Sequence, residues 1–221
     1  MVKRRSGPGL AELADEQDGR ALADESAELW DPAYTGVARD LLTAAVRCFA
    51  RSGYHGTTTR DIALRAGLSP AALYVHFTSK ESVLFEIVRS AHEHALAEIR
   101  VAGAPGADAT ATLSELMSRH TAWHARHPVA ARVAQLELSG LTPEHYEQVV
   151  AIRRATADLF RKAVSRGVED GSFAVSEVAP VVRAMLSLSI DLVRWYRLED
   201  GDSPEKLGRL YGELAVRMVR A

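Results

Sequence analysis

Residues 57–81 constrain this chain of 221 residues most strongly, because they predict two short helices joined by a tight turn. Thr58 carries a hydroxyl, and Asp61 carries a carboxylate three residues later, which is the pattern of a capping box at a helix start. Gly67 predicts the end of this helix, since glycine readily adopts the left-handed conformation found just after a helix.

The second helix of the pair begins at an equally clear signal. Ser69 is a favoured N-cap residue, and Pro70 stands at the first helical position, where the missing N–H costs nothing. We expect this helix to run to about residue 77. Two helices joined by a short turn with glycine form a helix-turn-helix, whose second helix fits the major groove of DNA.

The rest of the chain also has the apolar spacing of helices and contains no convincing strand, so the predicted fold class is all-α. Before the motif, a helix over residues 36–52 is closed by Gly53. After it, Ser79 caps a helix that runs to about residue 101. Further helices are expected over 109–126, over 129–139, from 143 to a glycine at 167 or 171, from about 176, and from 203 to the end.

The domain division follows from these patterns and from charge. Residues 1–34 have a net charge of about -4 and few large apolar residues, which predicts a disordered tail. Alternatively, Lys3, Arg4 and Arg5 form a basic arm that reaches a DNA minor groove. Residues 35–90 have a net charge of about +3 and hold the helix-turn-helix at 58–77, so they are the expected DNA-binding domain. Residues 91–221 are the expected ligand-binding and dimerisation domain.

The composition excludes several classes of protein. The chain has no run of 18 apolar residues, so no membrane-spanning helix is predicted. No apolar segment follows the basic N-terminus, as it would in a secretory signal, so we expect a cytoplasmic protein with no membrane partner. Cys48, the single cysteine, is expected to be a buried, inert thiol. A helical enzyme is the competing class, but the chain lacks a phosphate-binding glycine loop, a nucleophile elbow and a metalloprotease motif, so no catalytic residue is assigned.

The last two predicted helices carry apolar side chains on more than one side. A helix that is apolar nearly all round must bury two faces. One face fits the core of its own chain, and the other is expected to meet a second copy, which predicts a homodimer formed through these two helices.

The motif region resembles the TetR family of bacterial transcriptional regulators. The resemblance covers about residues 36–90 and rests on spaced matches throughout the helix-turn-helix, while the helical remainder fits the family in length and helix order. The matching segments are Gly53-Tyr54, Thr57-Thr58-Thr59-Arg60-Asp61-Ile62-Ala63, Gly67-Leu68-Ser69, Leu73-Tyr74-Val75-His76-Phe77 and Ser79-Lys80-Glu81.

The resemblance implies a homodimer that binds a palindromic operator in double-stranded DNA, with release by a small effector. It places ten residues at DNA: Thr58, Arg60, Ser69, Pro70, Ala71, Ala72, Tyr74, Val75, His76 and Lys80. Thr58 and Arg60 can reach a phosphate or a guanine edge, and arginine suits bidentate contact with guanine. The small or apolar residues favour close approach and thymine methyl contacts. Tyr74, His76 and Lys80 fall at phosphate-contacting positions, whereas Leu73 and Phe77 are expected in the core. Lys80 stands at a helix N-terminus, where a positive charge is unfavourable because it opposes the helix dipole. A phosphate partner would explain why a lysine occupies this position.

The C-terminal half more weakly resembles TetR-family members that respond to acyl-CoA thioesters of lipid or sterol catabolism, on residues 124–128, 137–138 and 194–197. Arg194 and Arg197 are candidates for the phosphates, beside Trp195. The expected ligand-binding set is Trp123, His124, Phe160, Met185, Arg194 and Trp195, with Met117, Val133, Leu136 and Leu188 as further apolar candidates. Alternatively, these residues pack in the core or in the dimer interface. The alternative function is a regulator of efflux or drug response that binds another hydrophobic ligand.

His120, His124 and His127 share one face of a predicted helix, a spacing that can present imidazoles to a metal ion. No cysteine or carboxylate of matching spacing accompanies them. We therefore expect a partly buried polar face or pocket lining, with no metal site and no cofactor beyond the effector.

Overall fold

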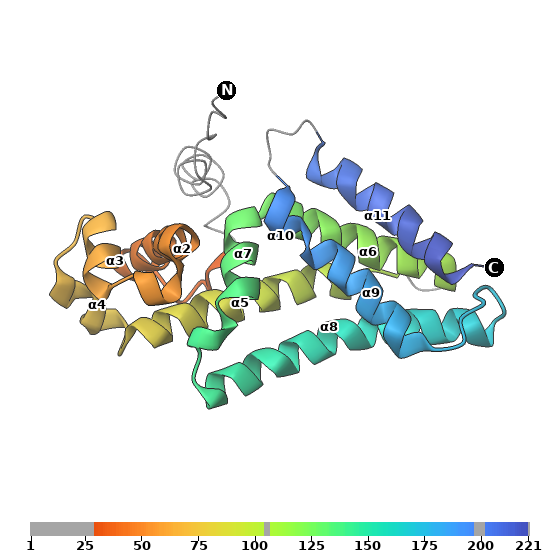
Figure 1. The fold of residues 1–221 in the computed structure, drawn as a ribbon, viewed down its shortest axis with the longest axis horizontal. Helices are drawn as coiled ribbons and strands as arrows, with labels where there is room; N and C mark the ends of the chain where they lie inside the picture. The colour runs from red at the N-terminus through yellow and green to blue at the C-terminus, as the bar shows by residue number, and fades with distance from the viewer. Residues whose placement is uncertain (1–28, 104–106, 197–201, 221) are drawn as a thin grey trace, which may run out of the picture.

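Helices form the regular structure of the residues that the computed structural model describes, which are 29–103, 107–196 and 202–220 (Figure 1). No strand occurs in these ranges, and the all-α prediction is confirmed. The elements are α2 (Val37–Gly56), α3 (Thr59–Arg65), α4 (Pro70–His76), α5 (Lys80–Arg100), α6 (Ala109–Arg126), α7 (Pro128–Leu136), the 3₁₀ turn η1 (Leu138–Gly140), α8 (Pro143–Glu169), α9 (Val178–Ile190), α10 (Leu192–Trp195) and α11 (Pro204–Val219).

The helix-turn-helix forms at the predicted boundaries. The hydroxyl of Thr58 accepts a hydrogen bond from the backbone N–H of Asp61 at 3.1 Å, and the Asp61 carboxylate accepts one from the backbone N–H of Thr58 at 2.9 Å. This is the capping box expected from sequence. Gly53 (φ 71°) interrupts α2 where the end of the helix was predicted.

The turn between α3 and α4 depends on Gly67, which has a φ of +71°. Its N–H donates to the carbonyl of Leu64 at 3.0 Å, and the N–H of Leu68 donates to the carbonyl of Ala63 at 2.8 Å. These two bonds form a complete Schellman motif and satisfy carbonyls that would otherwise lack partners at the end of α3. The turn therefore fixes the direction in which α4 leaves.

Two large hydrophobic cores lie along the molecule, and α5 takes part in both. A third, smaller cluster joins α6, α10 and α11. The first core joins α2, α3 and α4 to the first half of α5 and to α7. The second joins the end of α5 to α6, α8, α9 and α11. The first core thus continues from the helix-turn-helix into α7, beyond the position where the sequence predicts a domain division, so these helices share packed side chains.

The predicted tail is corrected at residues 29–34. Leu29 and Trp30 are both buried in the first core, and the Trp30 indole N–H donates to the hydroxyl of Thr43 at 3.0 Å. A buried tryptophan contributes a large apolar area, so this segment belongs to the folded domain. The basic arm at residues 3–5 lies outside the described residues.

The helices after α7 match one of the two predicted ends of the long helix and differ from the prediction at the helix that follows. The long helix α8 ends at Glu169, before Gly171 (φ +78°). Glycine is needed at 167, within this helix, because a Cβ there would lie 2.0 Å from the Phe173 ring. The helix predicted from 176 is divided between α9 and α10. The hydroxyls of Ser187 and Ser189 bond to backbone carbonyls at this end of α9, which competes with a continuous helix.

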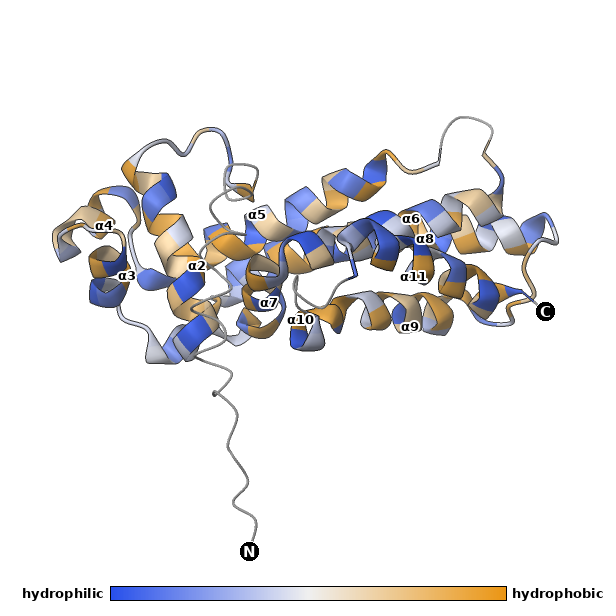
Figure 2. Cartoon of the chain, turned by 90° about the horizontal axis from the view of Figure 1, so that it is seen from above, coloured by the Kyte–Doolittle hydropathy of each residue, from blue (hydrophilic) through white to orange (hydrophobic). Residues whose placement is uncertain are grey.

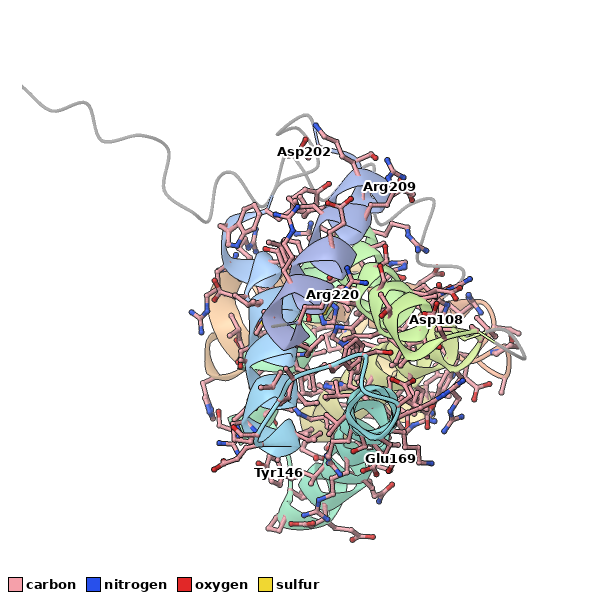
Figure 3. The ribbon with its side chains drawn as sticks, turned by 90° about the vertical axis from the view of Figure 1, so that its right-hand side faces the viewer. Asp108, Tyr146, Glu169, Asp202, Arg209 and Arg220 are labelled. Carbon is pink, nitrogen blue, oxygen red and sulfur yellow. The ribbon has the colours of Figure 1, made fainter. Side chains whose placement is uncertain are left out.

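Helix α11 packs along α6, and Figure 3 shows its two ends marked by Asp202 and Arg220. Glycines allow this close approach, since a Cβ at Gly208 would stand 2.5 Å from a backbone carbonyl oxygen of α6, and one at Gly212 would stand 2.6 Å from another. The opposite side of α11 leaves Leu210 and Leu214 exposed. Helix α9 is largely hydrophobic along its length (Figure 2). No described helix combines the length and apolar character needed to span a membrane.

Candidate DNA-binding surface and effector pocket

The outer face of α4 lies at one end of the molecule, beside α3 (Figure 1). Leu73 and Phe77 are buried, as predicted, and they anchor α4 in the first core. The other side of the helix is open: Val75 is 78% exposed and Tyr74 is 58% exposed. Further predicted contact residues on this surface are exposed, namely Thr58, Arg60, Ser69, Pro70, Ala71 and His76, while Ala72 is partly buried.

Two hydrogen bonds fix side chains on this surface. The Tyr74 hydroxyl lies 3.2 Å from the hydroxyl of Thr59, which ties α4 to the start of α3. The Thr58 hydroxyl donates to the Asp61 carboxylate at 2.6 Å. This bond and the one from the Thr58 backbone N–H lower the pKa of Asp61. Thr58 is therefore committed first to capping α3, and its role at DNA would be secondary to that structural role.

Lys80 has an intramolecular function that sequence reasoning missed. Its ammonium donates to the backbone carbonyl of Tyr54 at 2.8 Å and to that of Thr57 at 2.7 Å. It also lies 4.2 Å from the centroid of the Tyr54 ring. These contacts tie the start of α5 to the end of α2 and explain a lysine at a helix N-terminus without a phosphate. An ammonium has three donors, so one donor remains beyond these two bonds.

Side chains also connect the helix-turn-helix end to the later helices. The Glu137 carboxylate accepts from the backbone N–H of Tyr54 at 3.0 Å, next to the interruption of α2. The Glu81 carboxylate lies 2.7 Å from Nδ1 of His145 at the start of α8, and the His145 ring stacks on Phe85 with centroids 3.8 Å apart. These contacts tie the end of α7 to α2 and the start of α8 to α5.

A cavity of ≈ 510 Å³ lies among α5, α6, α7, α8 and α9. Apolar side chains form much of its wall, mainly from α5 and α9. Three arginines line it, Arg153 and Arg161 from α8 and Arg183 from α9, and no Asp or Glu is among its described lining residues. The cavity thus combines an apolar surface with positive charge.

The structure places two of the six predicted ligand residues in this wall, Trp123 and His124. Phe160 and Met185 are fully buried in the second core instead. The prediction for the other two is corrected as well, since neither Arg194 nor Trp195 lines the cavity.

Arg194 has a side chain that is 64% exposed and pairs with Asp191 at 3.2 Å, and Trp195 is 48% exposed. Of the further candidates, Met117 and Val133 are buried in the cores and Leu136 and Leu188 are exposed; Arg197 lies outside the described residues.

A sequence signal for the arginines was available. Arg153, Ala157 and Arg161 recur at intervals of four on α8, so they follow one another along one side of that helix. The pattern is hard to recognise because arginines also occur on solvent-exposed helix faces. The packing of the helices, rather than the spacing, shows that these two arginines line the cavity.

The histidines around the cavity are neutral. Burial lowers the pKa of His92 to about 4 and that of His124 to about 4, and it lowers the pKa of His120 further below its usual range. Nδ1 of His124 lies 2.8 Å from the His120 carbonyl, and Nδ1 of His120 lies 2.8 Å from the Ser189 hydroxyl. Among the described residues, no group of three His, Cys, Asp or Glu is placed to hold a metal ion. His120, His124 and His127 are buried, and the first two line the cavity, so the predicted polar face is a buried one.

Comparison with known families identifies both halves of the chain. A model described as "Bacterial regulatory proteins, tetR family" matches residues 41–87. One described as "Tetracyclin repressor-like, C-terminal domain" matches residues 106–219, more than half of the chain. The chain belongs to the TetR family. It is a helix-turn-helix transcriptional regulator and not an enzyme.

Several TetR-family proteins show the extent of the similarity. The "HTH-type transcriptional repressor KstR2" of Rhodococcus jostii (strain RHA1) is 34% identical over 166 residues, which are 74% of this chain and 81% of that protein. A solved TetR-family regulator from Rhodococcus RHA1 has a TM-score of 0.80 and 36% identity, and the match covers 85% of this chain and 99% of that one.

A more distant structure shares the TetR fold. The transcriptional regulator FadR from Bacillus subtilis, solved in complex with stearoyl-CoA, has a TM-score of 0.62 and 22% identity, over 82% of this chain and 98% of that one. At this identity the match concerns the fold.

Proposed function

We propose that this protein is a repressor that binds a palindromic operator as a homodimer and is released by a CoA thioester. The observation that carries the proposal is the combination of an exposed, anchored α4 at one end with an arginine-lined cavity in the helices behind it. Membership of the TetR family supports regulation through DNA binding. The operator, the effector and the contact residues are inferred from the side chains.

The α4 surface suits the major groove. Pro70, Ala71 and Ala72 are small and leave the backbone close to the groove floor, while the exposed Val75 can contact thymine methyl groups. Arg60 at the start of α3 is exposed, and its guanidinium can donate two N–H groups to the O6 and N7 atoms of a guanine. Tyr74 and His76 flank this surface as phosphate contacts, with Ser69 and Thr58 at the starts of the two helices.

The homodimer is expected to form through α9 and α11. The exposed side of α11 presents Leu210, Leu214 and Met218 at intervals of four, which align along one face of the helix. Leu188 on α9 is also exposed. Contiguous apolar side chains on a surface helix are typical of a protein interface. A two-fold axis through this face would set the separation of the two α4 helices and hence the half-site spacing.

A CoA thioester fits the cavity better than a neutral hydrophobic drug. The apolar wall from α5 and α9 suits an acyl chain, and Arg161 and Arg183 supply cations for phosphate groups. The alternative, a regulator of efflux that binds a neutral hydrophobic ligand, would supply no anion to Arg183, whereas Arg161 also pairs with Asp158 within α8. The FadR structure with stearoyl-CoA supports the same ligand class, and a fatty-acyl or a sterol-derived acyl group would satisfy it.

A gel-shift titration against the DNA upstream of the protein's own gene tests the proposal. We expect a specific complex that weakens steeply with salt and that fatty-acyl or sterol-derived CoA thioesters dissociate. Arg183→Gln should raise the thioester concentration needed for release and leave operator affinity unchanged. Arg194→Gln is the matched control, since that exposed arginine does not line the cavity. A specific complex that no thioester disturbs would overturn the effector assignment alone.

A further inference from the structure

Arg153 is a cation at one end of the effector cavity with no carboxylate partner among the described residues. Its Nη1 donates to Oε1 of Gln135 at 2.8 Å and lies 3.4 Å from Nε2 of His92. Both partners are uncharged, because burial keeps His92 neutral at physiological pH. A guanidinium has five donors, so most of its donor capacity is left for another group.

The remaining arginines lie toward the other end of the cavity. Arg153 and Arg161 are eight residues apart on α8, which corresponds to about 12 Å along the helix axis. Helix α9 runs back along α8 (Figure 1), so Arg183 in its early turns lies toward Arg161, whereas Ile190 lies toward Arg153. The cavity therefore has positive charge at both ends.

The wall between these ends is mostly apolar. Ala95, Ala157, Val182 and Leu186 contribute to it, together with the uncharged imidazoles. No described acidic side chain faces the cavity to neutralise Arg153. A partly buried cation without an ion-pair partner is unfavourable in the empty protein and favours a ligand that brings a negative charge.

We propose that the effector is a CoA thioester whose acyl group ends in a carboxylate, which Arg153 binds at the end of the cavity opposite Arg161 and Arg183. This inference rests on the proposed function and specifies the ligand at the same site. A carboxylate can accept two parallel N–H bonds from one guanidinium, a geometry that lysine does not reproduce. A plain fatty-acyl chain would place a methyl group against Arg153 and gain none of these bonds.

Isothermal titration calorimetry of the full-length protein with matched ligands tests this inference. The probes are octanoyl-CoA, suberoyl-CoA, which is the same chain with a terminal carboxylate, and free suberate. We expect suberoyl-CoA to bind at least about tenfold more tightly than octanoyl-CoA, the factor expected for hydrogen bonds to a charged group. Free suberate should bind far more weakly than suberoyl-CoA, because it lacks the phosphates.

Variants of Arg153 separate the carboxylate contact from general effects on the fold. Arg153→Gln should lower the affinity for suberoyl-CoA much more than that for octanoyl-CoA and so abolish the preference, and Arg153→Lys should restore only part of it. Arg154→Gln is the matched control, since Arg154 is the next residue on α8, is exposed and does not line the cavity. Circular dichroism confirms that each variant is folded.

The possible failures are distinguishable. Equal affinity for octanoyl-CoA and suberoyl-CoA would overturn the carboxylate inference and leave the CoA-responsive function intact. An equal loss in the Arg153 and Arg154 variants would overturn the role of Arg153. No binding of either thioester would overturn both this inference and the proposed effector class.

Discussion

Replacing Lys80 by methionine tests whether this side chain is primarily structural. The change keeps most of the stem and removes the ammonium, which donates to the carbonyls of Tyr54 and Thr57. Hydrogen bonds to charged groups contribute about 1.5–3 kcal/mol, and the Thr57 residue is buried, so we expect a loss of about 2 kcal/mol. For a chain of this size the melting temperature should fall by about 4–8 °C.

Thermal unfolding followed by circular dichroism measures the effect. Lys162→Met is the control, since Lys162 is exposed on α8 and should be almost neutral. The same Lys80 variant is then titrated with operator DNA over a range of salt concentrations. If the melting temperature is unchanged and the salt slope of DNA binding falls by about one, the ammonium acts at a phosphate and the structural argument is refuted.

Three further predictions concern pH, packing and coupling between the two ends. Burial lowers the pKa of His92 and of His124 to about 4, whereas a histidine in the unfolded chain has a pKa of about 6.5. The unfolded chain therefore binds protons at these histidines first as the pH falls, so the free energy of unfolding in urea should be lower at pH 5 than at pH 7 by about 2 kcal/mol per histidine. Gly208→Ala should lower the melting temperature, although alanine has a better helix propensity than glycine, because the new Cβ would lie 2.5 Å from a backbone oxygen of α6. An unchanged or higher melting temperature would contradict the tight contact between α6 and α11. Glu137→Gln should weaken operator binding in a gel shift without changing effector affinity by calorimetry, because it weakens the bond to the Tyr54 N–H; a loss of effector affinity instead would place Glu137 at the ligand.

The local signals in the sequence determined the helices and the motif. The capping box at Thr58 and Asp61, the turn at Gly67 and the start at Pro70 all appear in the structure where they were expected. Each involves atoms within a few residues of one another, so local sequence is sufficient to specify it. The same spaced residues led to the family, which the comparisons confirm.

The partners of individual side chains were decided only by the tertiary structure. Lys80 meets carbonyls more than twenty residues earlier in the chain, and Trp30 is buried by helices that follow it. Arg153 lines the cavity while Arg194 is exposed, although both are arginines on helices with apolar neighbours. Which face of a helix meets a cavity depends on how five helices pack around it, and that packing involves contacts between residues far apart in sequence. The sequence therefore determined which elements form, and the packing determined which charges line the cavity.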